Sequence, residues 1–197
     1  MSTLKVDTIL KRTGTGTITV GQSGDTVALP SATLTTPLPA ASGGTGSTTA
    51  PANTPAFKVY DTSDQSVADN SYVKATFGTE DYDTDSAFAS NKFTVPTGEG
   101  GKYLFYGSFG LNSNALNDIS YADVKLYKNG SGATATPQFF LYNDTTGFVR
   151  SVVFSYTGTL TLAAGDYVEV YGRIDDVGGS SMVFGSRSFA GHKLIGV

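Results

Sequence analysis

Every aromatic residue of this 197-residue chain lies at or after Phe57, and this asymmetry limits where a hydrophobic core can form. The 11 Tyr and 12 Phe are the side chains that bury the most area, and the chain has no Trp. The first 56 residues contain none of them and cannot build a core alone. We therefore expect one globular domain, residues 56–197, preceded by an appendage.

The appendage divides into two parts by composition. No charged residue occurs between Asp25 and Lys58, and segment 31–55 is rich in Thr, Ala, Pro, Gly and Ser, which predicts an extended linker. Residues 1–30 alternate Thr with Ile or Val between Gly pairs, as in 13–20, which is typical of short strands and turns. We expect these strands to pair with another chain, because their own edges are open; a disordered tail is the alternative.

The globular part carries regular strand signals separated by turn formers such as Asn129-Gly130 and Gly165-Asp166. In 167–171, Val168 and Val170 face one way while the intervening residues face the other. With 24 Gly, 7 Pro and only 15% charged residues, the chain favours an all-β sandwich or jelly roll over long helices. The expected strands are 56–60, 72–77, 87–95, 102–111, 119–128, 138–142, 148–157, 167–174 and 182–195.

The chain has no Cys and one His, which excludes disulfides, thiolate zinc sites and multi-histidine metal sites. His192 is the one candidate base for a Ser-His-Asp arrangement, with partners such as Ser186, Ser188 and Asp166. No Gly-x-Ser-x-Gly motif, dinucleotide loop or phosphate loop supports such chemistry. We therefore expect a protein without enzymatic activity and without a cofactor.

Charge and hydropathy restrict the possible partners. The 13 basic residues are outnumbered by 17 acidic ones, so the chain lacks the clustered positive charge that binds nucleic-acid phosphates. The first ten residues contain no apolar run longer than two residues, so no secretory signal is expected. No segment approaches the roughly 18 apolar residues of a membrane span. We expect a protein made in a cytosol that neither binds nucleic acid nor inserts into a membrane.

Four stretches of the globular part occur in a recognisable order: Phe88-Ala-Ser-Asn-Lys-Phe-Thr-Val-Pro96 with Gly101-Lys-Tyr-Leu-Phe105, then 124–130, 158–168 and 184–195. Their order and spacing resemble the globular head of the complement-q family, within the tumour-necrosis-factor-like jelly-roll superfamily. The resemblance implies a ten-stranded, two-sheet jelly roll that forms a homotrimer with aromatic strand faces around the threefold axis. The secreted members of the family have a signal peptide and a collagen stalk, neither of which we expect in this chain.

Strand 102–111 carries large side chains on both faces. Tyr103, Phe105 and Phe109 lie on one face, and Leu104 and Tyr106 lie on the other. Together with the resemblance, this pattern leads us to assign Tyr103, Phe105 and Phe109 to the trimer interface. The alternative is that both faces belong to the core.

The appendage resembles a second group of proteins. Segments 2–10, 14–20 and 21–26 and the Gly-rich stretch 42–46 resemble the amino-terminal parts of bacteriophage tail-fibre and fibre-like proteins. The two resemblances together predict a virion structural protein: a fibre, spike or decoration of the capsid or tail, bound to another virion protein through residues 1–30. Its jelly-roll tip would bind a host-surface glycan or protein. The alternative is a free carbohydrate-binding or cytokine-like jelly-roll module, which would not need the first 30 residues.

Two sets of polar residues are candidate binding sites. The alternating carboxylates of Asp81, Asp83 and Asp85 resemble a calcium loop, but Ser86 and Lys92 stand where its Gly and its bidentate Glu are required, which favours a solvated loop. The tip loops contain amides, carboxylates and rings of the kinds that bind sugars, with ordinary turns as the alternative. The tip candidates are Asn112, Asn114, Asn117, Tyr142, Asn143 and Asp144.

Overall fold

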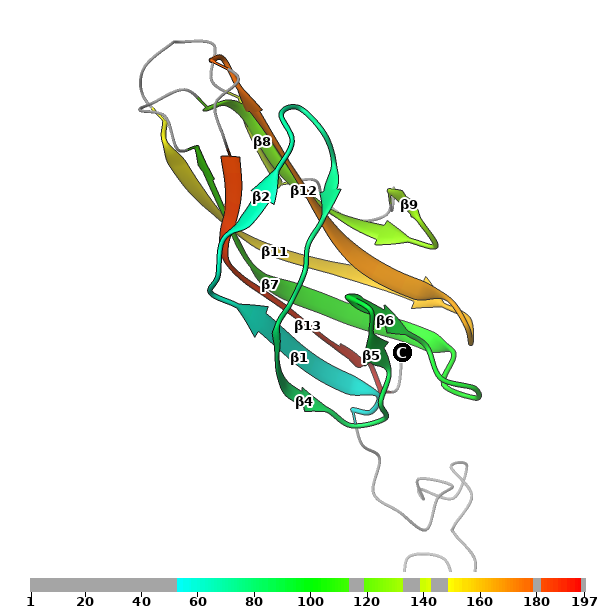
Figure 1. The fold of residues 1–197 in the computed structure, drawn as a ribbon. Coiled ribbons are helices and arrows are strands. Elements are labelled where there is room, and N and C mark those ends of the chain that lie inside the picture. Colours follow the sequence, from blue (N-terminus) through cyan, green and yellow to red (C-terminus); the bar gives the residue numbers. More distant parts are fainter. Residues whose placement is uncertain (1–52, 114–118, 133–138, 143–148, 179–181, 196–197) are drawn as a thin grey trace, which may run out of the picture. The chain divides into compact units, whose positions relative to one another are not determined.

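The computed structural model describes residues 53–113, 119–132, 139–142, 149–178 and 182–195, which belong to one compact unit, Pro51–Val197. These residues form two antiparallel sheets and contain no helix (Figure 1). One sheet contains β1 (Ala56–Asp61), β2 (Gln65–Val67), β4 (Thr79–Asp83), β7 (Gly101–Ser113), β11 (Ser151–Leu162) and β13 (Met182–Lys193). The other contains β3 (Val73–Lys74), β5 (Phe88–Ala89), β6 (Lys92–Thr94), β8 (Ile119–Lys128), β9 (Ser131–Gly132), β10 (Phe139–Tyr142) and β12 (Tyr167–Asp176).

The strand order joins parts of the chain that are far apart in sequence. The six-stranded sheet has the order β11-β7-β13-β1-β4, with β2 on β13, and the seven-stranded sheet has the order β10-β8-β12-β6-β5, with β3 on β12 and β9 on β8. The first and last strands, β1 and β13, pair along their length. This is a two-sheet jelly roll, and the predicted all-β fold class is confirmed.

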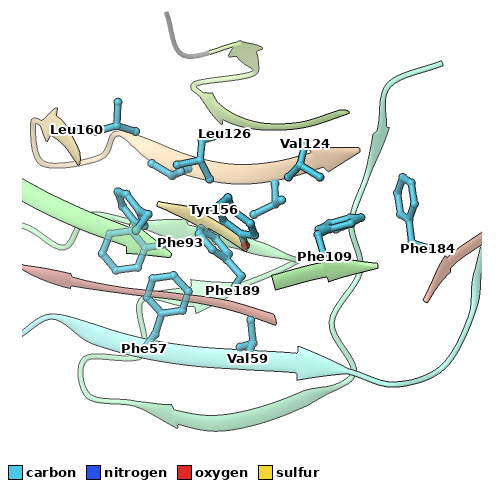
Figure 2. Close-up of a cluster of buried hydrophobic side chains, with 14 of the residues drawn as sticks. Phe57, Val59, Phe93, Phe109, Val124, Leu126, Tyr156, Leu160, Phe184 and Phe189 are labelled. Carbon is cyan, nitrogen blue, oxygen red and sulfur yellow. The ribbon is translucent and has the colours of Figure 1, made fainter. Parts of the chain in front are cut away.

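The core between the two sheets contains a cluster of aromatic rings together with aliphatic side chains (Figure 2). The ring of Phe57 on β1 lies 4.9 Å from that of Phe93 on β6, so the two sheets meet directly, and it contacts Phe189 edge-on, also at 4.9 Å. Val124 and Leu126 of β8 enter the same core. Alternation along each strand sends these residues inward and leaves their neighbours on the outer faces, as the period of a β-strand requires.

A network of turns joins β8 to β12 at one end of the seven-stranded sheet. Asn129 and Gly130 both have positive φ angles, 52° and 78°, which form a tight hairpin turn. The Asn129 amide donates to Asp166 (2.7 Å), and Lys128 pairs with the same carboxylate at 2.8 Å. Lys128, Asn129 and the backbone N–H of Ala163 lower the pKa of Asp166 to about 2. The two predicted turns, at Asn129-Gly130 and at Gly165-Asp166, are therefore joined by a hydrogen bond and an ion pair.

The structure differs from the strand predictions in three places. The predicted strand 72–77 pairs over only two residues, as β3. The predicted strand 87–95 is split into β5 and β6 by Ser90 and Asn91, whose φ angles are 53° and 57°. Segment 79–83, interpreted from its carboxylates as a loop, is the edge strand β4, where charged side chains reach solvent. Together with other short strands, these give thirteen strands in the described part of the chain, where the resemblance implies ten.

The predicted attachment segment, 1–30, and most of the predicted linker, 31–55, lie outside the described residues. In the part of the chain that the structure describes, there is no helix long and apolar enough to cross a membrane.

Candidate functional site

The residues predicted to form the trimer interface lie inside the subunit. Tyr103, Phe105 and Phe109 each have 0% of their surface exposed. Phe105 packs between Phe93 and Phe189, with ring centroids 5.7 and 5.8 Å away. Burial raises the pKa of Tyr103 to about 12. A side chain with no exposed area in the single chain has none to bury against a neighbour, so assigning these three residues to an interface is wrong, and they form the core.

The opposite side of the same strand faces outward and carries part of a continuous aromatic surface, which we call the tyrosine face. Tyr106 on β7 pairs with Ala190 on β13, Ala190 with Lys58 on β1, and Lys58 with Tyr82 on β4, so these residues form one row across four strands. Tyr60, Tyr82 and Tyr106 keep 39%, 41% and 38% of their surface exposed, enough to be buried by a partner. The tyrosine face comprises Lys58, Tyr60, Tyr82, Leu104, Tyr106 and His192.

The tyrosine face carries little uncompensated charge. The Lys58 ammonium donates to Asp81 at 2.8 Å, and this hydrogen bond together with the carboxylate charge raises the pKa of Lys58. Partial burial and the neighbouring Tyr106 raise the pKa of Tyr82 above its ordinary value. The exposed rings of this face are apolar area that costs little to desolvate against a partner.

The three candidate calcium ligands perform separate structural tasks. Asp81 pairs with Lys58, as described above. The carboxylate of Asp83 accepts from the backbone N–H groups of Ala87 and Phe88 at 3.0 and 2.7 Å, which closes the turn after β4. Asp85 accepts from the neighbouring Thr84 hydroxyl at 2.6 Å. Among the described residues no group of acidic or histidine side chains is placed to hold a metal ion, so the structure does not bring these three carboxylates together as ligands.

The structure places two of the six tip candidates. Asn112, at the end of β7, is half-buried and accepts a hydrogen bond from the Ser151 hydroxyl, so it joins β7 to β11. Tyr142, at the end of β10, is 71% exposed and remains a binding candidate. Asn114, Asn117, Asn143 and Asp144 lie outside the described residues.

The residues named for a Ser-His-Asp arrangement are not gathered into one site. His192 lies on the tyrosine face, with its ring 6.1 Å from that of Tyr106. The Ser188 hydroxyl, four residues earlier on the same strand, bonds to that of Ser108 at 3.1 Å. Asp166 is part of the turn network of the other sheet.

A shallow hollow lies at one end of the molecule, beside β1 and β4. Its volume is about 310 Å³, and its lining includes Phe77, Phe88, Glu80 and Asn91. The Asn91 side chain accepts from the backbone N–H of Phe77 at 2.8 Å, so it joins the turn between β5 and β6 to the segment after β3. The hollow is open to solvent, and we assign it no function.

No family model and no curated protein matches the chain. Solved structures do match. The globular domain of zebrafish complement 1qA protein has a TM-score of 0.47 at 20% identity, covering 71% of this chain and 97% of that domain. The Eiger TNF of S. frugiperda has a TM-score of 0.50 at 15% identity, covering 72% of this chain and 93% of that one. The likeness to the TNF structure is one of fold, and it agrees with the two-sheet jelly roll.

The tyrosine face could not be predicted from the sequence, because alternation shows that a strand has two faces but not which of them is buried. Strand 102–111 has an aromatic residue on each, and the pattern alone does not say which one meets the second sheet. Two glycines are the sequence signal that could have identified the inward face. A Cβ on Gly107 would stand 2.6 Å from the Tyr156 hydroxyl, and one on Gly191 would stand 2.6 Å from the Phe105 ring, so both glycines leave room for inward-facing rings.

Proposed function

We propose that this protein is a trimeric structural protein of a bacteriophage particle, a fibre, spike or decoration that joins the virion through residues 1–30 and presents the jelly roll outward. The observation that carries the proposal is the tyrosine face, which is exposed on one chain and suited to burial in an assembly. In this proposal the protein is located in the virion, has no enzymatic activity, and contacts the host surface with its jelly-roll tip.

Several properties of the tyrosine face support self-association. Three half-exposed tyrosines and Leu104 lie on the flat outer face of one sheet, and the charge of Lys58 is compensated by Asp81. Apolar and aromatic area of this kind is typical of interfaces between identical subunits. Three copies related by a closed rotation can each bury this face against the next copy, which ends the assembly at a trimer.

Replacing Tyr106 with glutamate should convert the trimer into a folded monomer. The new carboxylate would be buried without a partner in the interface, whereas in the single chain it lies at a position that is 38% exposed. Light scattering after size-exclusion chromatography measures the mass, and circular dichroism the fold. Tyr142→Glu, on the other sheet, is the matched control and should stay trimeric. A wild-type chain that is monomeric at micromolar concentration would refute the trimer.

The attachment role rests on the appendage. The alternating Thr, Ile and Val of residues 1–30 suit strand addition to an exposed sheet edge of another virion protein. Three such segments held by one trimer act together, so three weak contacts give one strong attachment. Segment 31–55, expected from its composition to be an extended linker, would then separate the jelly roll from the particle surface.

Deleting residues 1–30 should leave a folded, trimeric jelly roll that no longer joins the particle. Deleting 56–197 should remove both the trimer and stable attachment, because the remaining segment has no core. Mass spectrometry and electron microscopy of purified particles measure incorporation, with the full chain as the control. If the full chain is absent from particles, or if the truncated chain incorporates at normal copy number, the free binding-module alternative replaces the appendage.

A further inference from the structure

The outer face of the seven-stranded sheet carries a second and larger set of aromatic side chains. Val124 and Leu126 of β8 and Val168 and Val170 of β12 point into the core, so the residues between them point outward. Strands β8 and β12 lie side by side (Figure 1), and their outward rings are joined by rings from β10 and from the residue before β3. We call this surface the aromatic platform: Tyr72, Tyr121, Tyr127, Phe140, Tyr142, Tyr167 and Tyr171.

A charged cluster holds the middle of the platform in place. Asp123 points outward yet is 0% exposed, because its neighbours cover it. The Tyr72 and Tyr121 hydroxyls donate to its carboxylate at 2.5 and 3.2 Å. The guanidinium of Arg173 lies 4.2 Å from the Tyr121 ring and 4.8 Å from the Tyr72 ring, which adds cation–π attraction. These rings are therefore fixed before any ligand arrives, which reduces the entropy lost on binding.

The platform is open at its β10 edge. Phe140 pairs with Asp123, and Tyr142 pairs with Tyr121, so both rings extend the rigid cluster by one strand. The Phe140 ring is nearly parallel to that of Tyr121, at 12° and 6.3 Å between centroids. Phe140 is 60% exposed and Tyr142 71%, the largest exposed fractions of any aromatic side chain that the structure describes. Flat ring surface is thus available beside a preorganised polar cluster.

The charges on this face leave a small positive excess. Lys125 and Arg173 lie 3.7 and 3.5 Å from the Asp123 carboxylate, Lys74 pairs with Glu169 at 2.7 Å, and the Lys92 ammonium lies 4.5 Å from the Tyr167 ring. Each of these cations is held against a carboxylate or a ring, so they do not form the clustered positive patch that a polyanion requires. At the outward positions within 121–127, 140–142 and 167–173, every apolar side chain is aromatic, and none is aliphatic. A ligand that suits these rings offers an apolar ring face and needs no net charge.

We propose that the aromatic platform binds a neutral glycan, with the C–H faces of two pyranose rings stacked on Phe140 and Tyr142. The sugar hydroxyls are then within reach of phenol hydroxyls, which both donate and accept hydrogen bonds. This inference deepens the proposed function, since it rests on the jelly roll meeting a cell surface, and it names the chemistry met there.

The test is binding of the full chain to immobilised neutral oligosaccharides of glucose, galactose, mannose and N-acetylglucosamine, with hexuronate oligomers as the acidic arm. We expect binding to members of the neutral set. Phe140→Leu and Tyr142→Leu should each weaken that binding about tenfold, because leucine offers apolar area without a ring face. Phe140→Tyr and Tyr142→Phe keep the ring face and should retain more of the binding than the leucine variants.

Both positions are mostly exposed, so these variants should keep the melting temperature of the wild type. The inference is overturned if no neutral oligosaccharide binds, if only hexuronates bind, or if the leucine variants bind as well as their aromatic counterparts. The oligomeric state and particle incorporation of the same variants are measured in parallel. If a leucine variant forms trimers and incorporates into particles but has lost glycan binding, the result supports the aromatic platform. If the wild-type chain binds a neutral glycan but is absent from particles, the result refutes the role as a virion appendage and leaves the glycan site standing.

Discussion

Replacing Phe105 with alanine should lower the free energy of unfolding by about 3 to 5 kcal/mol, the cost of removing a buried phenylalanine and leaving a cavity. The Phe105 ring lies among Phe57, Phe93 and Phe189 and covers Gly191, so no neighbouring side chain can close the space without moving the strands. Urea unfolding followed by circular dichroism measures the loss. Phe105→Leu fills part of the space and should cost less.

The matched control is Leu104→Ala, one residue earlier on β7 and on the outer face. Leu104 is half-buried, so its loss should cost clearly less unfolding free energy in the single chain. Comparing Phe105→Ala with Leu104→Ala also distinguishes a core position from an interface position for Phe105. If Phe105→Ala kept its unfolding free energy and changed only the oligomeric state, Phe105 would belong to an interface and not to the core.

Replacing Arg187 with methionine should destabilise the domain by about 3 to 5 kcal/mol, because it removes a buried cation and leaves its acceptors unsatisfied. Arg187 is 3% exposed, and its guanidinium donates to the carbonyl oxygens of Thr76 (2.7 Å), Ser63 (2.8 Å) and Gly185 (2.9 Å). It also lies 3.5 Å from Asp61. Burial lowers the pKa of Arg187, with the Asp61 charge acting in the opposite direction.

Arg187→Lys should also be strongly destabilising, since one ammonium cannot reach acceptors on three different segments at once. Lys193→Ala, which breaks the half-exposed pair with Glu99 at 2.9 Å, is the control and should change the melting temperature little. Differential scanning calorimetry measures all three variants. If Arg187→Lys melted at the wild-type temperature, the charge alone would be sufficient, and the network of carbonyl contacts would not contribute to stability.

The candidate surfaces were only partly predictable. Tyr142 was identified as a possible sugar-binding residue from its type and position, and the structure leaves it exposed. Phe140, two residues earlier, gave no such signal, because an aromatic residue in a strand pattern is usually buried. Its exposure follows from β10 being an edge strand in which Phe140 pairs with Asp123, an outward position. That pairing joins segments that are not adjacent in sequence.

The distribution of aromatic residues and turn formers was sufficient, by itself, to predict an all-β sandwich or jelly roll in the part of the chain that carries the aromatic rings. Local propensity is sufficient for this, because alternation and turn chemistry act over a few residues. The inward and outward faces were decided only by tertiary structure. A strand such as β7 has two faces that differ little in sequence, and its pairing with β11 and β13 places Phe105 inside and Tyr106 outside. The same long-range pairing buries Arg187 and covers Asp123 with rings, and no local pattern specifies either.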